Sequence, residues 1–172
     1  MKRLAPSSVT FTFYLAAAVA LGPLSTDMYL PTFPQLAAFF NATPAEVQLT
    51  LSIFTFGIGG CQLIYGPLTD RFGRKPVILG GLLIYVLASL ACVVAVNIDQ
   101  LVISRFFQAL GACAAMVVPR AMVRDLFARE QAARQLSRMG TIMGLAPAIA
   151  PVIGGYIVVF YGWQSIFFIL GL

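Results

Sequence analysis

The chain alternates long apolar runs with short polar segments. Five runs, at residues 10–30, 46–65, 77–96, 101–123 and 139–160, are each about the 20 residues that a helix needs to cross the hydrocarbon core of a bilayer. A sixth apolar run, 163–172, starts after Gly162 and covers only about half of that length. The pattern predicts an all-α membrane protein with five complete transmembrane helices and the start of a sixth.

Composition supports a membrane protein and narrows its chemistry. Hydrophobic residues make up 60% of the chain and charged residues 10%, with a mean hydropathy of +0.91, whereas soluble domains carry about 25% charged residues. The net charge of +5 comes from basic residues near the ends of apolar runs, which favours membrane orientation over nucleic-acid binding. The chain has no histidine, so we expect no histidine-based catalysis and no metal site.

The basic residues predict the topology. Lys2 and Arg3 precede the first run, and the segment 66–76 between the second and third runs contains Arg71, Arg74 and Lys75. By the positive-inside rule both segments lie in the cytoplasm. The connections near Phe39, Ile98 and Gly162 contain no Lys or Arg and are expected outside. We expect the segment 66–76 to form a tight hairpin loop.

Two charged residues lie within the apolar runs. Asp27 is near the far end of the first run, and Arg105 lies six residues after Asp99, or about 9 Å along a helix. Such residues usually face protein or water and mark functional sites. The alternatives are that the first span ends before Asp27, and that Arg105 extends its side chain to the outer surface.

The segment 66–76 also carries a motif. Its order G-x-L-x-D-R-x-G-R-K resembles the loop between spans two and three of the major facilitator superfamily. The resemblance implies a conformational latch, formed by residues of this segment together with one acid at the inner end of span four: Gly66, Asp70, Arg71, Gly73, Arg74 and Asp125. The alternatives are a generic basic loop and a phosphate-binding loop, but the second needs Ser or Thr after the lysine, where Pro76 stands.

Two further motifs resemble proton-coupled members of this superfamily. Span four contains R-x-x-Q-x-x-G, beginning with Arg105 and Gln108. Span five contains A-P-x-x-A-P-x-x-G-G at 146–155, which resembles the antiporter motif although Ala146 and Ala150 replace glycines. Its landmark residues are Pro147, Pro151, Gly154 and Gly155. The second pattern, and the order D-M-Y-L-P at 27–31, resemble the Bcr/CflA branch of bicyclomycin and chloramphenicol resistance.

The resemblance implies proton-coupled multidrug efflux across the bacterial inner membrane, not an enzyme. Small amphipathic compounds would be the substrates and the proton gradient, rather than a cofactor, the energy source. Asp27, Arg105 and Gln108 would serve proton coupling or substrate binding. The match covers the first half of a family member, so a missing C-terminal half would be needed for transport. The alternatives are a truncated product without transport activity and an intramembrane enzyme, for which no nucleophile–base pair is recognisable.

Overall fold

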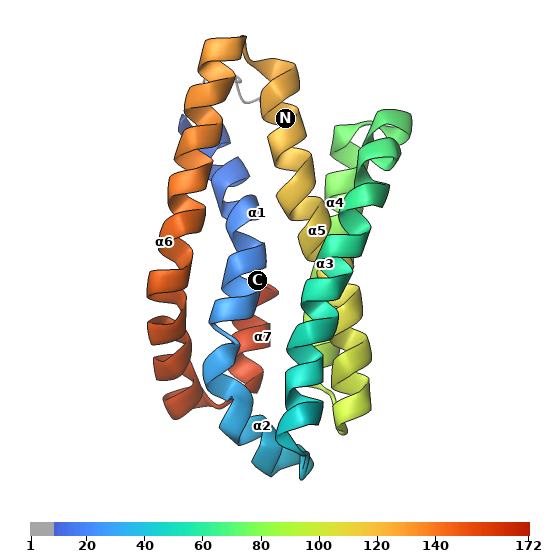
Figure 1. Cartoon of the computed structure of the whole chain (residues 1–172), viewed down its shortest axis with the longest axis vertical. Helices are drawn as coiled ribbons and strands as arrows, with labels where there is room; N and C mark the ends of the chain where they lie inside the picture. The colour runs from blue at the N-terminus through green and yellow to red at the C-terminus, as the bar shows by residue number, and fades with distance from the viewer. Residues whose placement is uncertain (1–8) are drawn as a thin grey trace.

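The structure is a computed structural model that describes residues 9–172, with side chains from Phe13 onward. The described chain is helical almost throughout and contains no strand (Figure 1). The predicted cytoplasmic residues Lys2 and Arg3 lie outside the described residues. The helices are α1 (Val9–Asp27), the 3₁₀ helix η1 (Leu30–Thr32), α2 (Phe33–Phe40), α3 (Pro44–Phe72), α4 (Arg74–Val93), α5 (Ile98–Leu126), α6 (Arg129–Tyr161) and α7 (Gln164–Leu170).

Five helical segments are long and apolar enough to cross a membrane. They are Phe13–Phe40, which joins α1, η1 and α2, and the helices α3, α4, α5 and α6, with 28, 29, 20, 29 and 33 residues. The short α7 has 7 residues and is the start of a sixth. The predicted fold class is therefore confirmed.

The expected hairpin loop at 66–76 and part of the connection between the first two spans are instead helical. The segment 66–76 was expected to be a loop, but α3 continues to Phe72 and α4 begins at Arg74, so Gly73 alone connects them. Gly73 has φ 85°, a backbone conformation that favours glycine. In the connection between the first two spans, residues 33–40 form α2, and a capping box between Thr43 and Glu46 starts α3. Helices continue past apolar runs because their backbone hydrogen bonds are satisfied internally.

The helices form a bundle in which α5 is central. In the most apolar 18-residue stretch of α5, 61% of the residues are buried, whereas in that of α6 only 22% are buried. α5 packs against α4, α3 and α1, while α6 lies along α1. Small residues permit the close packing: a Cβ added to Gly111 of α5 would lie 2.5 Å from the backbone nitrogen of Tyr85 on α4.

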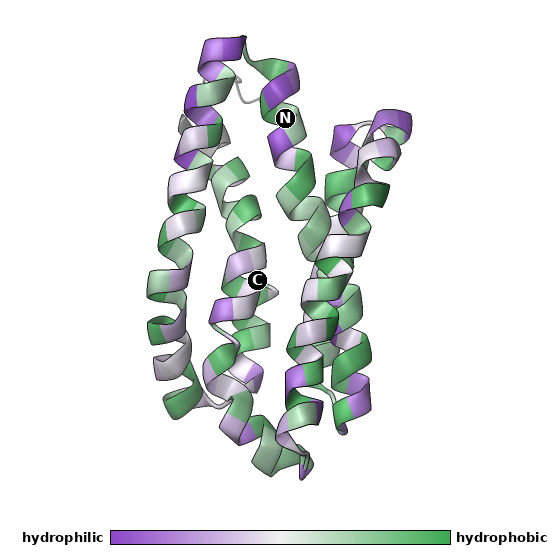
Figure 2. Cartoon of the chain, viewed as in Figure 1, coloured by the Kyte–Doolittle hydropathy of each residue, from purple (hydrophilic) through white to green (hydrophobic). Residues whose placement is uncertain are grey.

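The connections alternate between the two ends of the bundle. The α3–α4 and α5–α6 connections lie at one end, and α2 with the α4–α5 and α6–α7 connections lies at the other (Figure 1). The hydrophilic residues of α6 and of the α3–α4 junction gather at the first end (Figure 2). This arrangement places the basic residues Arg71, Lys75, Arg124 and Arg129 at a single end.

Candidate functional site

Arg105 lies at the centre of the bundle. Its side chain is 0% exposed, so the alternative that it extends to the surface is wrong. The guanidinium group donates from Nη1 to Oε1 of Gln108 at 2.7 Å and from Nη2 to the backbone oxygen of Ser25 at 3.2 Å. Because Arg105 and Gln108 are three residues apart, they lie on the same face of α5. The structure thus brings together two of the three residues predicted for coupling or binding.

The hydrogen bonds continue from Gln108 into α4 and α1. Gln108 Nε2 donates to Ser89 Oγ at 2.8 Å, and Ser89 Oγ donates to the backbone oxygen of Tyr85 at 2.7 Å. The hydroxyl groups of Tyr85 and Ser25 lie 2.6 Å apart. All these side chains are buried, so the network joins α1, α4 and α5 through polar groups that have no access to water.

Three aromatic rings surround the same guanidinium group. The Arg105 Cζ atom lies 4.0 Å from the ring centroid of Phe54, 4.3 Å from that of Tyr29 and 5.7 Å from that of Phe167. Tyr29 is itself held by a hydrogen bond between its hydroxyl group and that of Thr50. These rings come from α3, α7 and the link after α1. Together with the Ser25 carbonyl group on α1, they bring Arg105 into contact with four parts of the bundle.

Asp27 does not reach Arg105. Within the described residues no ion pair joins the two side chains. Asp27 is the last residue of α1 and is half-buried. Ser25, two residues earlier, turns its hydroxyl group toward Tyr85 of α4, and residues two apart in a helix project roughly 200° apart. Asp27 therefore projects away from the network, although its segment is tied to Arg105 through the Ser25 carbonyl group.

The predicted latch residues gather at the α3–α4 junction. Arg74 Nε donates to Asp125 Oδ2 at 2.9 Å, and Arg74 Nη1 lies 3.1 Å from Asp70 Oδ1. Arg74 also donates to the Thr69 hydroxyl group. Arg74 therefore links the end of α3 to the end of α5. Arg71 is exposed and its guanidinium group lies over the ring of Phe72, while Gly66 lies inside α3 with open space beside it.

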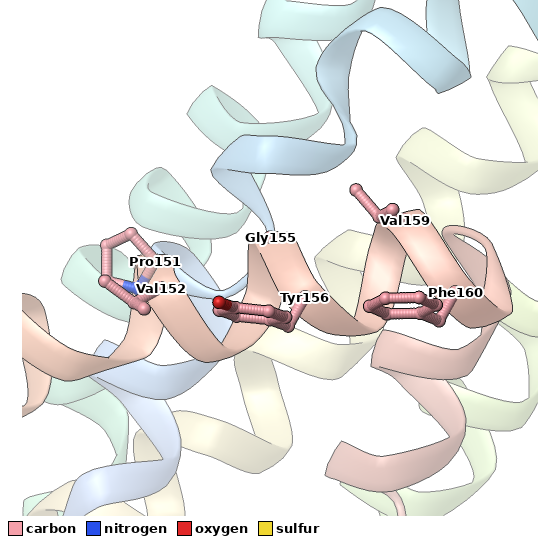
Figure 3. A pocket seen from close by; sticks show the side chains of 6 residues that line it. All are labelled: Pro151, Val152, Gly155, Tyr156, Val159 and Phe160. Carbon is pink, nitrogen blue, oxygen red and sulfur yellow. The ribbon is translucent and has the colours of Figure 1, made fainter.

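The residues of the span-five motif occupy two faces of α6. Gly154 faces inward, where an added Cβ would lie 2.5 Å from the Met28 backbone oxygen. Ala150, which replaces a motif glycine, is also buried. By contrast Pro147 is exposed, and Pro151 and Gly155 line an open groove of 420 Å³ together with Val152, Tyr156, Val159 and Phe160 (Figure 3).

Several residues of the Arg105 site were not predicted from the sequence. Ser25, Phe54, Ser89 and Phe167 belong to ordinary apolar runs, and no local signal distinguishes them. Tyr29 was part of the D-M-Y-L-P pattern, which supplied the one available clue. Among the described residues no group of His, Cys, Asp and Glu could hold a metal ion.

Known proteins resemble this chain over most of its length. A "Bicyclomycin resistance protein homolog" of Haemophilus influenzae is 38% identical over 95% of this chain, which covers 42% of that relative. A "Chloramphenicol resistance protein" of Pseudomonas aeruginosa is 39% identical over 88% of the chain and 36% of the relative. A "Multidrug resistance protein MdtL" of Klebsiella pneumoniae is 37% identical over 88% of this chain, which covers 39% of that relative. The chain thus spans well under half the length of these relatives.

The family comparison covers the helical core described above. The model of the Major Facilitator Superfamily matches residues 15–172, which include all the helices from α1 to α7 except the first turns of α1. Together with its five apolar helices, this match identifies a multi-pass membrane protein. The chain belongs to the Major Facilitator Superfamily.

Proposed function

We propose that this chain is part of a transporter, not an enzyme, that exports small amphipathic drug-like compounds. The observation that carries the proposal is that three relatives, 37–39% identical over at least 88% of the chain, bear the names of bicyclomycin, chloramphenicol and multidrug resistance proteins. We assign it to the Bcr/CflA branch. Because the chain covers 36–42% of these relatives, a second helical bundle would complete the transporter.

The energy source in this proposal is the proton gradient, without a cofactor. Asp27 would bind and release the proton, and Arg105 with Gln108 would sense that change or bind substrate. Supporting this assignment, the Arg105 guanidinium group holds the Ser25 carbonyl group, two residues before Asp27. A shift of the Asp27 segment would therefore be transmitted directly to Arg105, and through Gln108 to Ser89 on α4.

The other motif residues would serve the conformational change. Asp70 and Asp125 would hold Arg74 in one state of the transporter and release it in the other. On α6, Pro147, Pro151 and Gly155 would shape the face that meets the second bundle, while Gly154 packs inward. The protein would lie in the bacterial inner membrane with its N-terminus in the cytoplasm, because the basic residues gather at the end with the α3–α4 and α5–α6 connections.

Replacing Asp27 tests the proposed coupling. In a complete transporter that contains this bundle, we expect Asp27→Asn to abolish uphill drug efflux driven by an imposed pH gradient in proteoliposomes. Membrane insertion should be unchanged, because the amide is easier to insert than the carboxylate. Asp99→Asn is the matched control, since Asp99 is exposed at the start of α5. Undiminished uphill transport by Asp27→Asn would rule out its proposed role.

The alternative is that this chain transports nothing by itself. It is favoured by the coverage of the relatives, because alternating access by rocking requires two bundles. Vesicles containing the chain with and without a C-terminal extension separate the two cases. We expect drug efflux from the extended protein alone, whereas efflux from the 172-residue chain would show that it works without a second bundle supplied in the same polypeptide.

A further inference from the structure

We propose that an aromatic cage, rather than a carboxylate, holds Arg105 as a buried cation. The cage consists of Tyr29, Phe54 and Phe167, whose ring centroids lie 4.0–5.7 Å from the Arg105 Cζ atom. These three residues are then positioning residues of the Arg105 site. The inference rests on the packing of the chain and does not require the proposed export function.

The hydrogen bonds of Arg105 do not supply a negative charge. Its two described acceptors are the side-chain amide oxygen of Gln108 and the backbone oxygen of Ser25, and both are neutral. Its Nε atom has no hydrogen-bond partner. Within the described residues no Asp or Glu lies within ion-pair distance of it. A fully buried guanidinium group without a counter-ion is costly, so another source of favourable electrostatic energy is needed.

The ring faces supply that energy. Each aromatic face carries partial negative charge, and its attraction for a cation is strongest where water is excluded. Phe54 and Tyr29 are each 0% exposed, as is Phe167. The rings also support one another, because the centroids of Tyr29 and Phe167 lie 5.5 Å apart and the Tyr29 hydroxyl group bonds to Thr50. The cage therefore fixes the guanidinium group while tying α3 and α7 to α5.

Fluorination of Phe54 tests the cage with little change in ring shape. Fluorine atoms withdraw electron density from the ring face and weaken its attraction for a cation in steps. We would incorporate mono-, di- and trifluorophenylalanine at position 54 of the full chain in detergent. Unfolding would be followed by the fluorescence of Trp163, the single tryptophan, which is buried beside Phe167. We expect the unfolding temperature to fall with each fluorine, by about 4–8 °C over the series.

Two controls separate the cage from simple packing. Phe56, on the same helix, is 72% exposed, and its fluorination should leave the unfolding temperature unchanged. In an Arg105→Met background, fluorination at position 54 should no longer lower the unfolding temperature. The proposal would be overturned if the unfolding temperature fell equally with fluorination at positions 54 and 56. It would also be overturned if the fall at position 54 were unaltered in the absence of Arg105. Should Arg105→Met fail to fold, the same fluorine series at Phe106 decides the question, because its half-buried ring is not one of the three that lie over Arg105 and should give no stepwise fall.

Discussion

At the residue scale, the polar centre of the bundle depends on Gln108. Its amide oxygen accepts from Arg105 and its amide nitrogen donates to Ser89, so a single side chain satisfies a cation on α5 and a hydroxyl group on α4. The Gln side chain carries an acceptor and a donor on one planar amide group. An apolar residue at this position would leave Arg105 Nη1 without its partner and would remove the hydrogen bond that Ser89 Oγ accepts.

We therefore expect Gln108→Leu to destabilise the chain. A buried donor or acceptor without a partner costs about 1–3 kcal/mol, and more where the group is charged, which corresponds to a fall of several degrees in the unfolding temperature in detergent. Gln62→Leu is the control, because Gln62 is exposed in the middle of α3. If the two variants unfold at the same temperature, the network contributes no stability.

At the element scale, the packing of α4 on α5 depends on glycines that face the neighbouring helix. Gly81 of α4 lies against Ala114, and Gly111 of α5 lies against the backbone of α4. The adjacent Gly80 has open space beside it. With little hydrophobic driving force between helices in lipid, such close packing is a main source of their association.

The neighbouring glycines Gly80 and Gly81 give a matched pair of variants. We expect Gly81→Ala to lower stability by about 1–3 kcal/mol, because the new methyl group would clash with that of Ala114. Gly80→Ala should leave stability unchanged or raise it, since alanine favours the helix and meets nothing. Thermal unfolding of the two variants checks this, and a loss of stability at Gly80 equal to that at Gly81 would contradict the described helix contact.

At the scale of the whole molecule, charge is distributed between the ends of the bundle. The end with the α3–α4 and α5–α6 connections carries Arg71, Lys75, Arg124 and Arg129, all exposed. The opposite end carries the exposed acids Glu46 and Asp99. The placement of these basic residues at one end supports the proposed orientation.

The first whole-molecule prediction concerns orientation. In a background without Cys61, Cys92 and Cys113, single cysteines replacing Phe39 or Asp99 should react with an impermeant reagent from outside the cell. Cysteines replacing Arg71 or Arg129 should react only after the cytoplasmic side is opened, because basic segments remain inside. Labelling at position 39 from the cytoplasm alone would reverse the topology.

The second whole-molecule prediction concerns Arg74 and its partners Asp70 and Asp125. The ion pairs of Arg74 are partly exposed, with Asp70 71% and Asp125 50% exposed, so each contributes less than about 1 kcal/mol to stability. We expect Asp70→Asn to leave unfolding nearly unchanged but to alter the ratio of inward- to outward-facing states in a complete transporter, and to reduce transport. Site-directed crosslinking measures that ratio. An unaltered ratio with normal transport would contradict a latch function.

The sequence by itself determined the number of membrane-spanning helices, their alternating direction and the two charges placed among apolar residues. These features depend on local composition and length, which hydropathy measures directly. The cost of a charge within an apolar run also singled out Arg105, whereas Gln108 and the latch role of Arg74 came from motifs that resemble the family.

The tertiary structure decided which of these residues meet and which faces they occupy. Lipid and protein interior are both apolar, so hydropathy cannot distinguish a buried face of α6 from an exposed one; Gly154 packs on Met28 while Pro147 is exposed. The partners of Arg105 come from segments up to 80 residues away, a separation at which no periodic pattern operates. Asp27 and Arg105 were grouped by their chemistry. In the structure the helical rotation from Ser25 to Asp27 makes the Asp27 side chain project away from Arg105.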